Sequence, residues 1–299
     1  MQRFINLFSL LTFLFIVGCT GSAEKSAEKE EKKEKKVEKQ YNDLLSNLEN
    51  EASGTKAAAS NAKTMERNGI KLTPVEDSPD FPKAKLTLKS PNRKTIQPGV
   101  TNVIFDVENY ELGNQTQDAE DKLCANSAKG QHIHWILNNE PYTAHYTEAF
   151  EKEFKDGHYV ALAFLSRSYH ESLKHKEAYQ LTQFTVGQGR PFAQDLSKEH
   201  LFYSRPKGTY IGERNIEKVM LDFYLVNADL APNSYRVRAT INGTTFVLTD
   251  WVPYMMEGLG EGEHTVKLEL LDKDGRFVPG PYNSVTRKFT LLKDEPLGN

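Results

Sequence analysis

The chain has 299 residues, and its 38 lysines and arginines nearly balance its 41 aspartates and glutamates, which leaves a formal net charge of −3. This balance gives no reason to expect a nucleic-acid partner or a strongly basic membrane patch. After the first nineteen residues, no apolar run approaches the ~20 residues that a helix needs to cross a bilayer, so we expect the remainder to fold in water.

The first nineteen residues have the pattern of an export signal. A positive charge at Arg3 precedes an apolar stretch, residues 4–17, that is too short to span a membrane as a mature helix. The stretch ends in Ile16-Val17-Gly18-Cys19, which resembles the lipobox of bacterial lipoproteins. This resemblance implies that residues 1–18 are a signal peptide, that the Cys19 sulfur is lipidated, and that acyl chains hold the mature protein on a bacterial membrane. An ordinary secretory signal with an incidental cysteine is the alternative.

A tether and a stalk are expected to follow the lipidated cysteine. Residues 22–39 are almost entirely Glu, Lys, Ala and Ser, so residues 19–40 are predicted to be the lipid anchor and a charged tether. Apolar residues then recur at helical spacing until Asn68-Gly69, a typical helix stop. Because three prolines lie between this stop and residue 82, residues 41–82 are predicted to be a helical stalk and hinge.

From residue 83 the hydrophobic pattern changes to the alternation of half-buried strands, as in residues 103–107. Turn signals such as Asp156-Gly157 and Asn242-Gly243 separate these runs at spacings typical of antiparallel sandwiches. The pattern also occurs twice, with residues 131–139 matching residues 235–243. We therefore predict an all-β fold of two tandem immunoglobulin-like β-sandwiches, residues 83–189 and 190–299. A single large sandwich with accidental internal similarity is the alternative.

The region from about Leu86 to the end resembles two-domain exported lipoproteins of the Bacteroidota type. The stretches that carry this resemblance are His132-Ile133-His134, Glu140-Pro141-Tyr142, residues 166–172, residues 202–208 and Val278-Pro279-Gly280-Pro281. The resemblance implies a β-rich fold and a location in the cell envelope. We expect attachment to the outer membrane in preference to the inner one. It assigns no activity to any residue.

Histidines form the sharpest candidate site. Residues two apart on a strand share a face, so His132 and His134 are predicted to point outward while the apolar residues between and after them face the core. Two such imidazoles bind Cu²⁺ or Zn²⁺ if further ligands converge on them. The candidates are His145, His170 and Cys124. The alternative is a pair of histidines that is simply solvated or hydrogen-bonded.

A second candidate site is basic. Arg205, Lys207, Arg236 and Arg238 lie in the second repeat, and guanidinium groups two apart on one strand face can grip a carboxylate or phosphate. This pattern would suit an anion, a phosphopeptide or a glycan. Aromatic residues, namely Tyr142, Tyr146, Trp251 and Tyr254, suggest a stacking platform, but the last two belong to a Trp251-Val252-Pro253-Tyr254 stretch that is better explained as an inter-sheet crossover with its rings in the core.

For catalysis the sequence offers little. It contains no Gly-x-Ser-x-Gly elbow, no His-Glu-x-x-His motif and no phosphate-cradling glycine loop. We therefore expect a membrane-anchored envelope lipoprotein that binds an envelope protein, a glycan or a small ligand without catalysis. A copper- or zinc-binding module centred on His132 and His134 is the first alternative, and anion or glycan recognition by the second repeat is the other.

Overall fold

A computed structural model describes residues 62–189 and 194–294 of the chain. The chain divides into two compact units, residues 1–57 and 58–299, and all described residues belong to the second unit. The predicted signal peptide, the lipidated Cys19, the charged tether and the stalk as far as residue 61 lie outside the described residues. Within the described ranges, no helix combines the length and apolar character needed to cross a membrane.

The first repeat forms two sheets, which contain strands β3 to β10. One sheet has the order β3-β5-β8 and the other has the order β4-β10-β9-β6-β7. The elements are β3 (Lys85–Ser90), β4 (Thr95–Ile96), β5 (Gly99–Glu108), β6 (His132–Leu137), β7 (Thr143–His145), β8 (Ala149–Phe154), β9 (Gly157–Ser166), the short 3-10 helix η1 (Lys176–Ala178) and β10 (Tyr179–Val186).

The second repeat reproduces this arrangement. Its sheet β12-β18-β17-β14-β15 matches β4-β10-β9-β6-β7 strand by strand, and β11-β13-β16 matches β3-β5-β8. The elements are β11 (His200–Arg205), β12 (Gly208–Ile211), α2 (Glu213–Glu217), β13 (Val219–Val226), β14 (Arg236–Ile241), β15 (Thr244–Leu248), β16 (Tyr254–Glu257), β17 (Gly262–Leu271) and β18 (Ser284–Leu292).

Details of the pairing also repeat. In each half the short second strand pairs in parallel, β4 with β10 and β12 with β18, and the first strand carries a bulge, in β3 and in β11. In the first half β5 pairs with β8, while β6, β9 and β10 lie side by side, as strands B, E and C, F, G do in immunoglobulin-like sandwiches. The prediction of an all-β fold built from antiparallel sheets is confirmed. The boundary at residue 190 stays a prediction, because residues 190–193 lie outside the described part.

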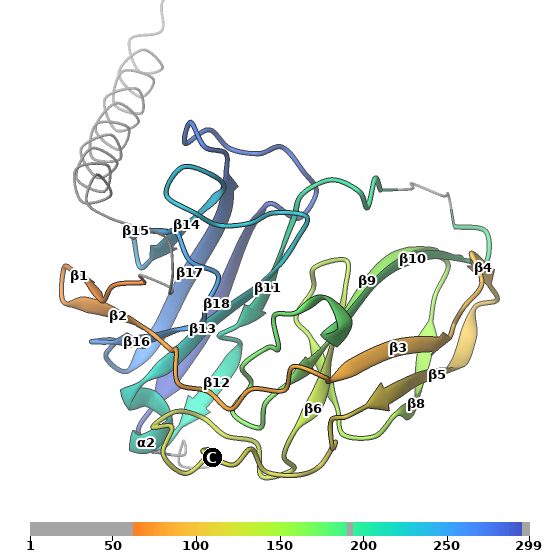
Figure 1. The fold of residues 1–299 in the computed structure, drawn as a ribbon, viewed down its shortest axis with the longest axis horizontal. Coiled ribbons are helices and arrows are strands. Elements are labelled where there is room, and N and C mark those ends of the chain that lie inside the picture. The colour runs from red at the N-terminus through yellow and green to blue at the C-terminus, as the bar shows by residue number, and fades with distance from the viewer. Residues whose placement is uncertain (1–61, 190–193, 295–299) are drawn as a thin grey trace, which may run out of the picture. The chain divides into compact units, whose positions relative to one another are not determined.

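The predicted helical stalk is wrong for its last residues. Strand β1 (Met65–Arg67) and strand β2 (Ile70–Pro74) form a hairpin, and β2 pairs with β16 of the second repeat (Figure 1). Asn68 and Gly69 both have positive φ, 48° and 77°, which is the signature of a two-residue hairpin turn. Asn-Gly ends a helix and turns a hairpin equally well. The alternation at Ile70 and Leu72, both buried, is the signal that distinguishes a strand here.

Three large apolar clusters and a fourth, small one around Cys124 and Tyr169 hold the described residues together. One lies inside each repeat, and the third lies between them. The third cluster joins side chains of β6 and β9 to side chains of β11 and β13, and it consists of Ile136, Tyr142, Val160, Leu162, Phe164, Phe202, Tyr224, Val226 and Tyr282. Both faces of β9 are therefore buried, one against its own sandwich and one against the second repeat.

Candidate metal centre

Two histidines of the candidate site lie on β6, at the contact between the repeats. As predicted, the rings of His132 and His134 lie together, with centroids 4.8 Å apart. The expectation that they face solvent is wrong, because both residues are 0% exposed. The second repeat covers this face through residues such as Phe202 and Tyr224, so a sheet face that is expected to be polar and solvent-exposed in a single sandwich is interior when the two repeats pack together.

The third histidine, His170, comes from the loop after β9. An isolated bridge between Ser166 and Ser172 closes this loop, and the second repeat has the same bridge between Leu271 and Phe277. At the matching position in the second repeat stands Gly275, with φ 75°, and His170 has φ 70°. A non-glycine residue in this left-handed region costs roughly 1 kcal/mol. The first repeat therefore holds an imidazole where backbone geometry favours glycine.

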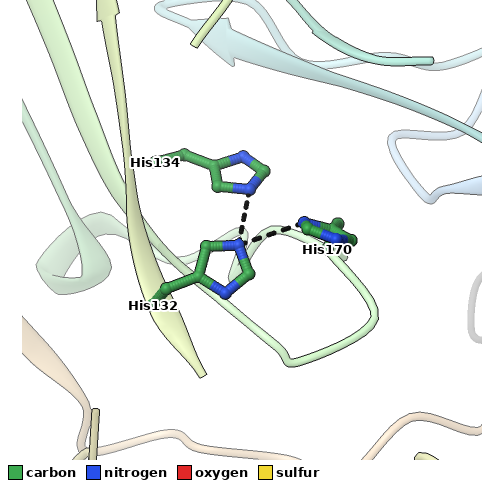
Figure 2. A group of neighbouring side chains, drawn as sticks. All are labelled: His132, His134 and His170. Carbon is green, nitrogen blue, oxygen red and sulfur yellow. Dashed lines mark hydrogen bonds between the residues drawn. The ribbon is translucent and has the colours of Figure 1, made fainter. Parts of the chain in front are cut away.

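The three histidines direct ring nitrogens at one another (Figure 2). His132 Nε2 lies 2.9 Å from His134 Nε2 and 3.1 Å from His170 Nδ1. All three ligand atoms lie within 4.8 Å of one another. Zinc bonds of about 2.0–2.1 Å in a tetrahedron place neighbouring ligand nitrogens about 3.3 Å apart, which is close to the two separations from His132, and rotation of the His134 and His170 rings would bring the third pair to a similar distance.

The hydrogen bonds around the cluster define the tautomer of one ring. His132 Nδ1 lies 2.8 Å from the carbonyl oxygen of Gly130, which only accepts, so Nδ1 carries the proton and Nε2 presents its lone pair. On the other side of His134, Nδ1 lies 3.4 Å from Ser204 Oγ. A carbonyl or hydroxyl partner on the remaining ring nitrogen is the usual support of a metal-binding histidine, since it fixes ring and tautomer.

A bulge in β11 supplies part of the surroundings. The pairing of β11 with β13 shifts between Tyr203 and Arg205, so Ser204 is the additional residue. Because of this shift, Arg205 does not return to the Tyr203 face but joins Ser204 on the face that meets the first repeat. There Arg205 Nη1 donates a hydrogen bond to the hydroxyl of Tyr142 at 3.3 Å.

Tyr142 is the aromatic partner of the cluster. Its ring stacks on His134, with centroids 3.6 Å apart and planes 13° apart, and its hydroxyl lies 3.4 Å from His170 Nδ1. Lys207 Nζ lies 3.8 Å from the centroid of the Tyr142 ring. It also donates a hydrogen bond to the Tyr142 carbonyl at 2.6 Å. Tyr142 therefore positions His134 and connects the histidines to two basic side chains.

The imidazoles of the cluster are held neutral. Burial lowers the pKa of His132 to about 4, and burial lowers the pKa values of His134 and His170 well below the usual range. The positive charges of Arg205 and Lys207 act in the same direction on all three rings. Neutral imidazole is the form that binds a metal ion, so protons do not compete for these nitrogens at neutral pH.

These lowered pKa values predict acid sensitivity of the metal-free protein. An unfolded histidine takes up a proton near pH 6.5, whereas folded His132 does so only near pH 4 and the pKa values of His134 and His170 are also lowered, so stability is complete above about pH 6.5 and decreases as the pH falls toward 4. Each such imidazole contributes a slope of up to about 1.4 kcal/mol per pH unit. Urea unfolding between pH 7.5 and pH 5 measures this slope. The His170→Gly variant should show a shallower decrease, and an equal slope in both proteins would contradict the assignment.

Two of the other predicted ligands lie elsewhere. His145 sits opposite Ile133 in the β6–β7 pair, so it shares the core face and not the face of His132 and His134. It stacks on Phe150 at 3.3 Å between centroids. The inclusion of His145 in the metal site is therefore wrong. Cys124 is a free, buried thiol in a separate small cluster, where burial raises its pKa to about 11.

The predicted basic site does not assemble either. Arg236 is buried and hydrogen-bonded to the carbonyls of Asp272 and Lys273. Arg238 forms an ion pair with Glu269 at 2.9 Å on the same sheet. Arg205 belongs to the histidine cluster instead, so the prediction of one anion site with all three arginines is wrong.

Sequence reasoning missed the connection between the repeats. Tyr142 was expected on a stacking platform, and Ser204 was not singled out. No local sequence pattern predicts the bulge in β11. This bulge directs Ser204 and Arg205 toward a histidine pair some seventy residues earlier in the chain. The fold and the site together define a two-sandwich β protein with a three-histidine cluster at the junction of its repeats, in which His132 and His134 are buried and His170 is partly exposed.

No protein-family model matches the chain, and no curated protein matches it. Solved structures with a similar fold include fibronectin(III)-like modules of CbhA from Clostridium thermocellum, at 12% identity over 72% of this chain and 99% of that chain, with a TM-score of 0.25. They also include SGBP-B of a mixed-linkage glucan utilization locus of Bacteroides ovatus in complex with a heptasaccharide, at 9% identity over 69% and 70% of the two chains, with a TM-score of 0.22. A Ca²⁺-stabilized adhesin of an Antarctic bacterium that binds ice matches at 12% identity over 71% and 49%, with a TM-score of 0.21. At these scores, function is argued from the residues of this chain alone.

Proposed function

We propose that the protein is a non-catalytic binding module that holds a transition-metal ion, Cu²⁺ or Zn²⁺, at His132, His134 and His170. The observation that carries the proposal is the convergence of three ring nitrogens, 2.9 Å and 3.1 Å apart along two sides of the cluster. Imidazole is a preferred ligand of both ions. A purely structural role for three neighbouring histidines requires no such convergence, because aromatic rings fill a core without aligning their nitrogens.

The surroundings favour a metal over a hydrogen-bonded trio. In the metal-free cluster only one lone pair, that of His132 Nε2, is available to accept from two neighbouring nitrogens. His170 also adopts its left-handed backbone at an energetic cost, although glycine serves at the same place in the second repeat. Three protein ligands leave a coordination position open, and His170 is partly exposed, which gives the site contact with solvent.

Direct binding measurements test the proposal. The metal-free full chain is titrated with Cu²⁺ or Zn²⁺ in competition with a chromophoric chelator, and one ion per chain is expected. Double replacement of His132 and His134 by alanine should abolish binding, whereas His145→Ala should leave it unchanged. Stoichiometric binding that survives the double replacement would show that the ion is held elsewhere.

We also propose that a lipid anchor at Cys19 attaches this module to the bacterial cell envelope, where its partner is a protein, a glycan or a small ligand. The lipobox-like Ile16-Val17-Gly18-Cys19 supports this anchoring. Cys19→Ser should release the protein from membranes because acylation requires the sulfur, and it should leave the sandwiches folded because they begin beyond residue 62. Membrane fractionation and mass spectrometry of the mature N-terminus provide the measurement. An unmodified N-terminus at another residue would refute the anchor.

A further inference from the structure

Two basic side chains at the histidine cluster lack an acidic partner. Other charges in the neighbourhood are paired: Arg167 with Glu171 at 2.9 Å, and Lys174 with Asp222 at 2.5 Å. Among the residues that the structure describes, no carboxylate lies within 4.0 Å of Arg205 or Lys207. The guanidinium of Arg205, although only 6% of the residue is exposed, bonds to two neutral hydroxyls, those of Tyr142 and Tyr210.

An unpaired charge in such a place is unusual. Burying a cation without an anionic partner costs several kcal/mol, and buried charges in proteins are normally paired. The neutral imidazoles of the cluster do not compensate the positive charge of Arg205. A divalent ion at the three histidines would add two further positive charges, and the Tyr142 hydroxyl, 3.3 Å from Arg205 Nη1 and 3.4 Å from His170 Nδ1, bridges the two groups.

We propose that the centre takes an anionic oxygen ligand, a carboxylate or a phosphate, at the open position of the metal ion, and that Arg205 and Lys207 supply the charge that holds it. This inference rests on the proposed metal site. The metal ion binds one oxygen of the anion, while the guanidinium and ammonium groups compensate the remaining negative charge. Arginine is suited to this because its planar donors match carboxylate and phosphate oxygens.

Removing a positive charge at Arg205 or Lys207 should therefore affect the metal ion and the anion in opposite directions. Removing the charge of Lys207 takes a cation away from a metal ion, so affinity for the bare ion should be unchanged or higher. The same change removes attraction for an anion, so anion affinity should fall. A residue that merely supports the fold would lower both affinities together.

The experiment uses the full chain loaded with Cu²⁺ in anion-free buffer. Azide is the spectroscopic probe, since its binding to Cu²⁺ gives a charge-transfer band, and inorganic phosphate and acetate are then tested as competitors that distinguish the two oxygen classes. For Lys207→Gln we expect about tenfold weaker binding of azide and of the better competitor, with Cu²⁺ affinity retained. Lys129→Gln is the matched control, because Lys129 lies over the Tyr146 ring, 5.5 Å from its centroid, and Tyr146 in turn contacts His132.

Each outcome bears on a separate statement. Cu²⁺ binding without any response to azide, phosphate or acetate would overturn the anion proposal and leave the metal site intact. Equal losses in Lys207→Gln and Lys129→Gln would also overturn it, since a general surface charge would then explain the effect. Failure of both Cu²⁺ and Zn²⁺ to bind in anion-free buffer would refute the proposed function and this inference with it.

Discussion

Replacing His170 with glycine should abolish metal binding and leave the stability of the metal-free protein within about 1 kcal/mol of the original. The variant loses one of three ligands, but it gains the residue that the second repeat uses at the same left-handed position, Gly275. Relief of the backbone strain, roughly 1 kcal/mol, offsets the larger entropy that glycine loses on folding, about 0.5–1 kcal/mol. This replacement therefore removes metal binding without a large change in the stability of the fold.

Thermal unfolding with and without metal measures this effect. At a metal concentration a hundred times Kd, the original protein should gain about 2.7 kcal/mol, and His145→Ala should gain the same amount. His170→Gly should gain nothing. If the glycine variant responded to Cu²⁺ or Zn²⁺ as the original does, the third ligand would be wrongly assigned.

Asp222→Ala should destabilise the protein by about 3–5 kcal/mol, because it leaves the Lys174 ammonium at the junction of the repeats without its carboxylate. The side chain of Asp222 is 0% exposed and that of Lys174 is 15% exposed, and Ser172 Oγ also donates to the same carboxylate oxygen at 3.1 Å. The pair joins the loop after β9 to β13. Loss of one partner should therefore lower the stability of both repeats.

Urea unfolding of the single and double variants tests the assignment. Lys174→Met together with Asp222→Leu removes both charges and should recover most of the loss, since well-packed apolar residues often replace a buried ion pair at little cost. Asp222→Asn separates charge from shape. A loss below 1 kcal/mol for Asp222→Ala would mean that water reaches the ammonium group and the pair is effectively at the surface.

The fold was largely predictable because its signals are local. Alternation along residues such as Val103 and Phe105, turn pairs such as Asn242-Gly243 and the internal repeat all lie within short windows of sequence. The hairpin at Asn68-Gly69 was missed since its two neighbouring apolar residues are too few to outweigh the preceding alanines. Its true partner, β16, lies at the far end of the chain.

The site was predictable only in part. The pairing of His132 with His134 follows from strand geometry, but their burial depends on a second sandwich packing on the same face. His145 was assigned wrongly because its face depends on the register of a hairpin, which sets it opposite Ile133. Arg205 was noticed as a cation. Arg205 reaches the first repeat only because of the bulge in β11, and the sequence does not predict this bulge.

The β1–β2 hairpin has a consequence for how the chain folds. The second sandwich takes strands from both ends of the described chain, with Thr73 Oγ1 donating to Glu257 across 184 positions of sequence, whereas the first sandwich is contiguous. A protein emerging from the ribosome can therefore complete its first sandwich early, while the sheet that covers the histidines must wait for distant strands. Until then the imidazoles of β6 lie on a solvent-exposed face of the first sandwich. They become buried last, when the second repeat packs on that face.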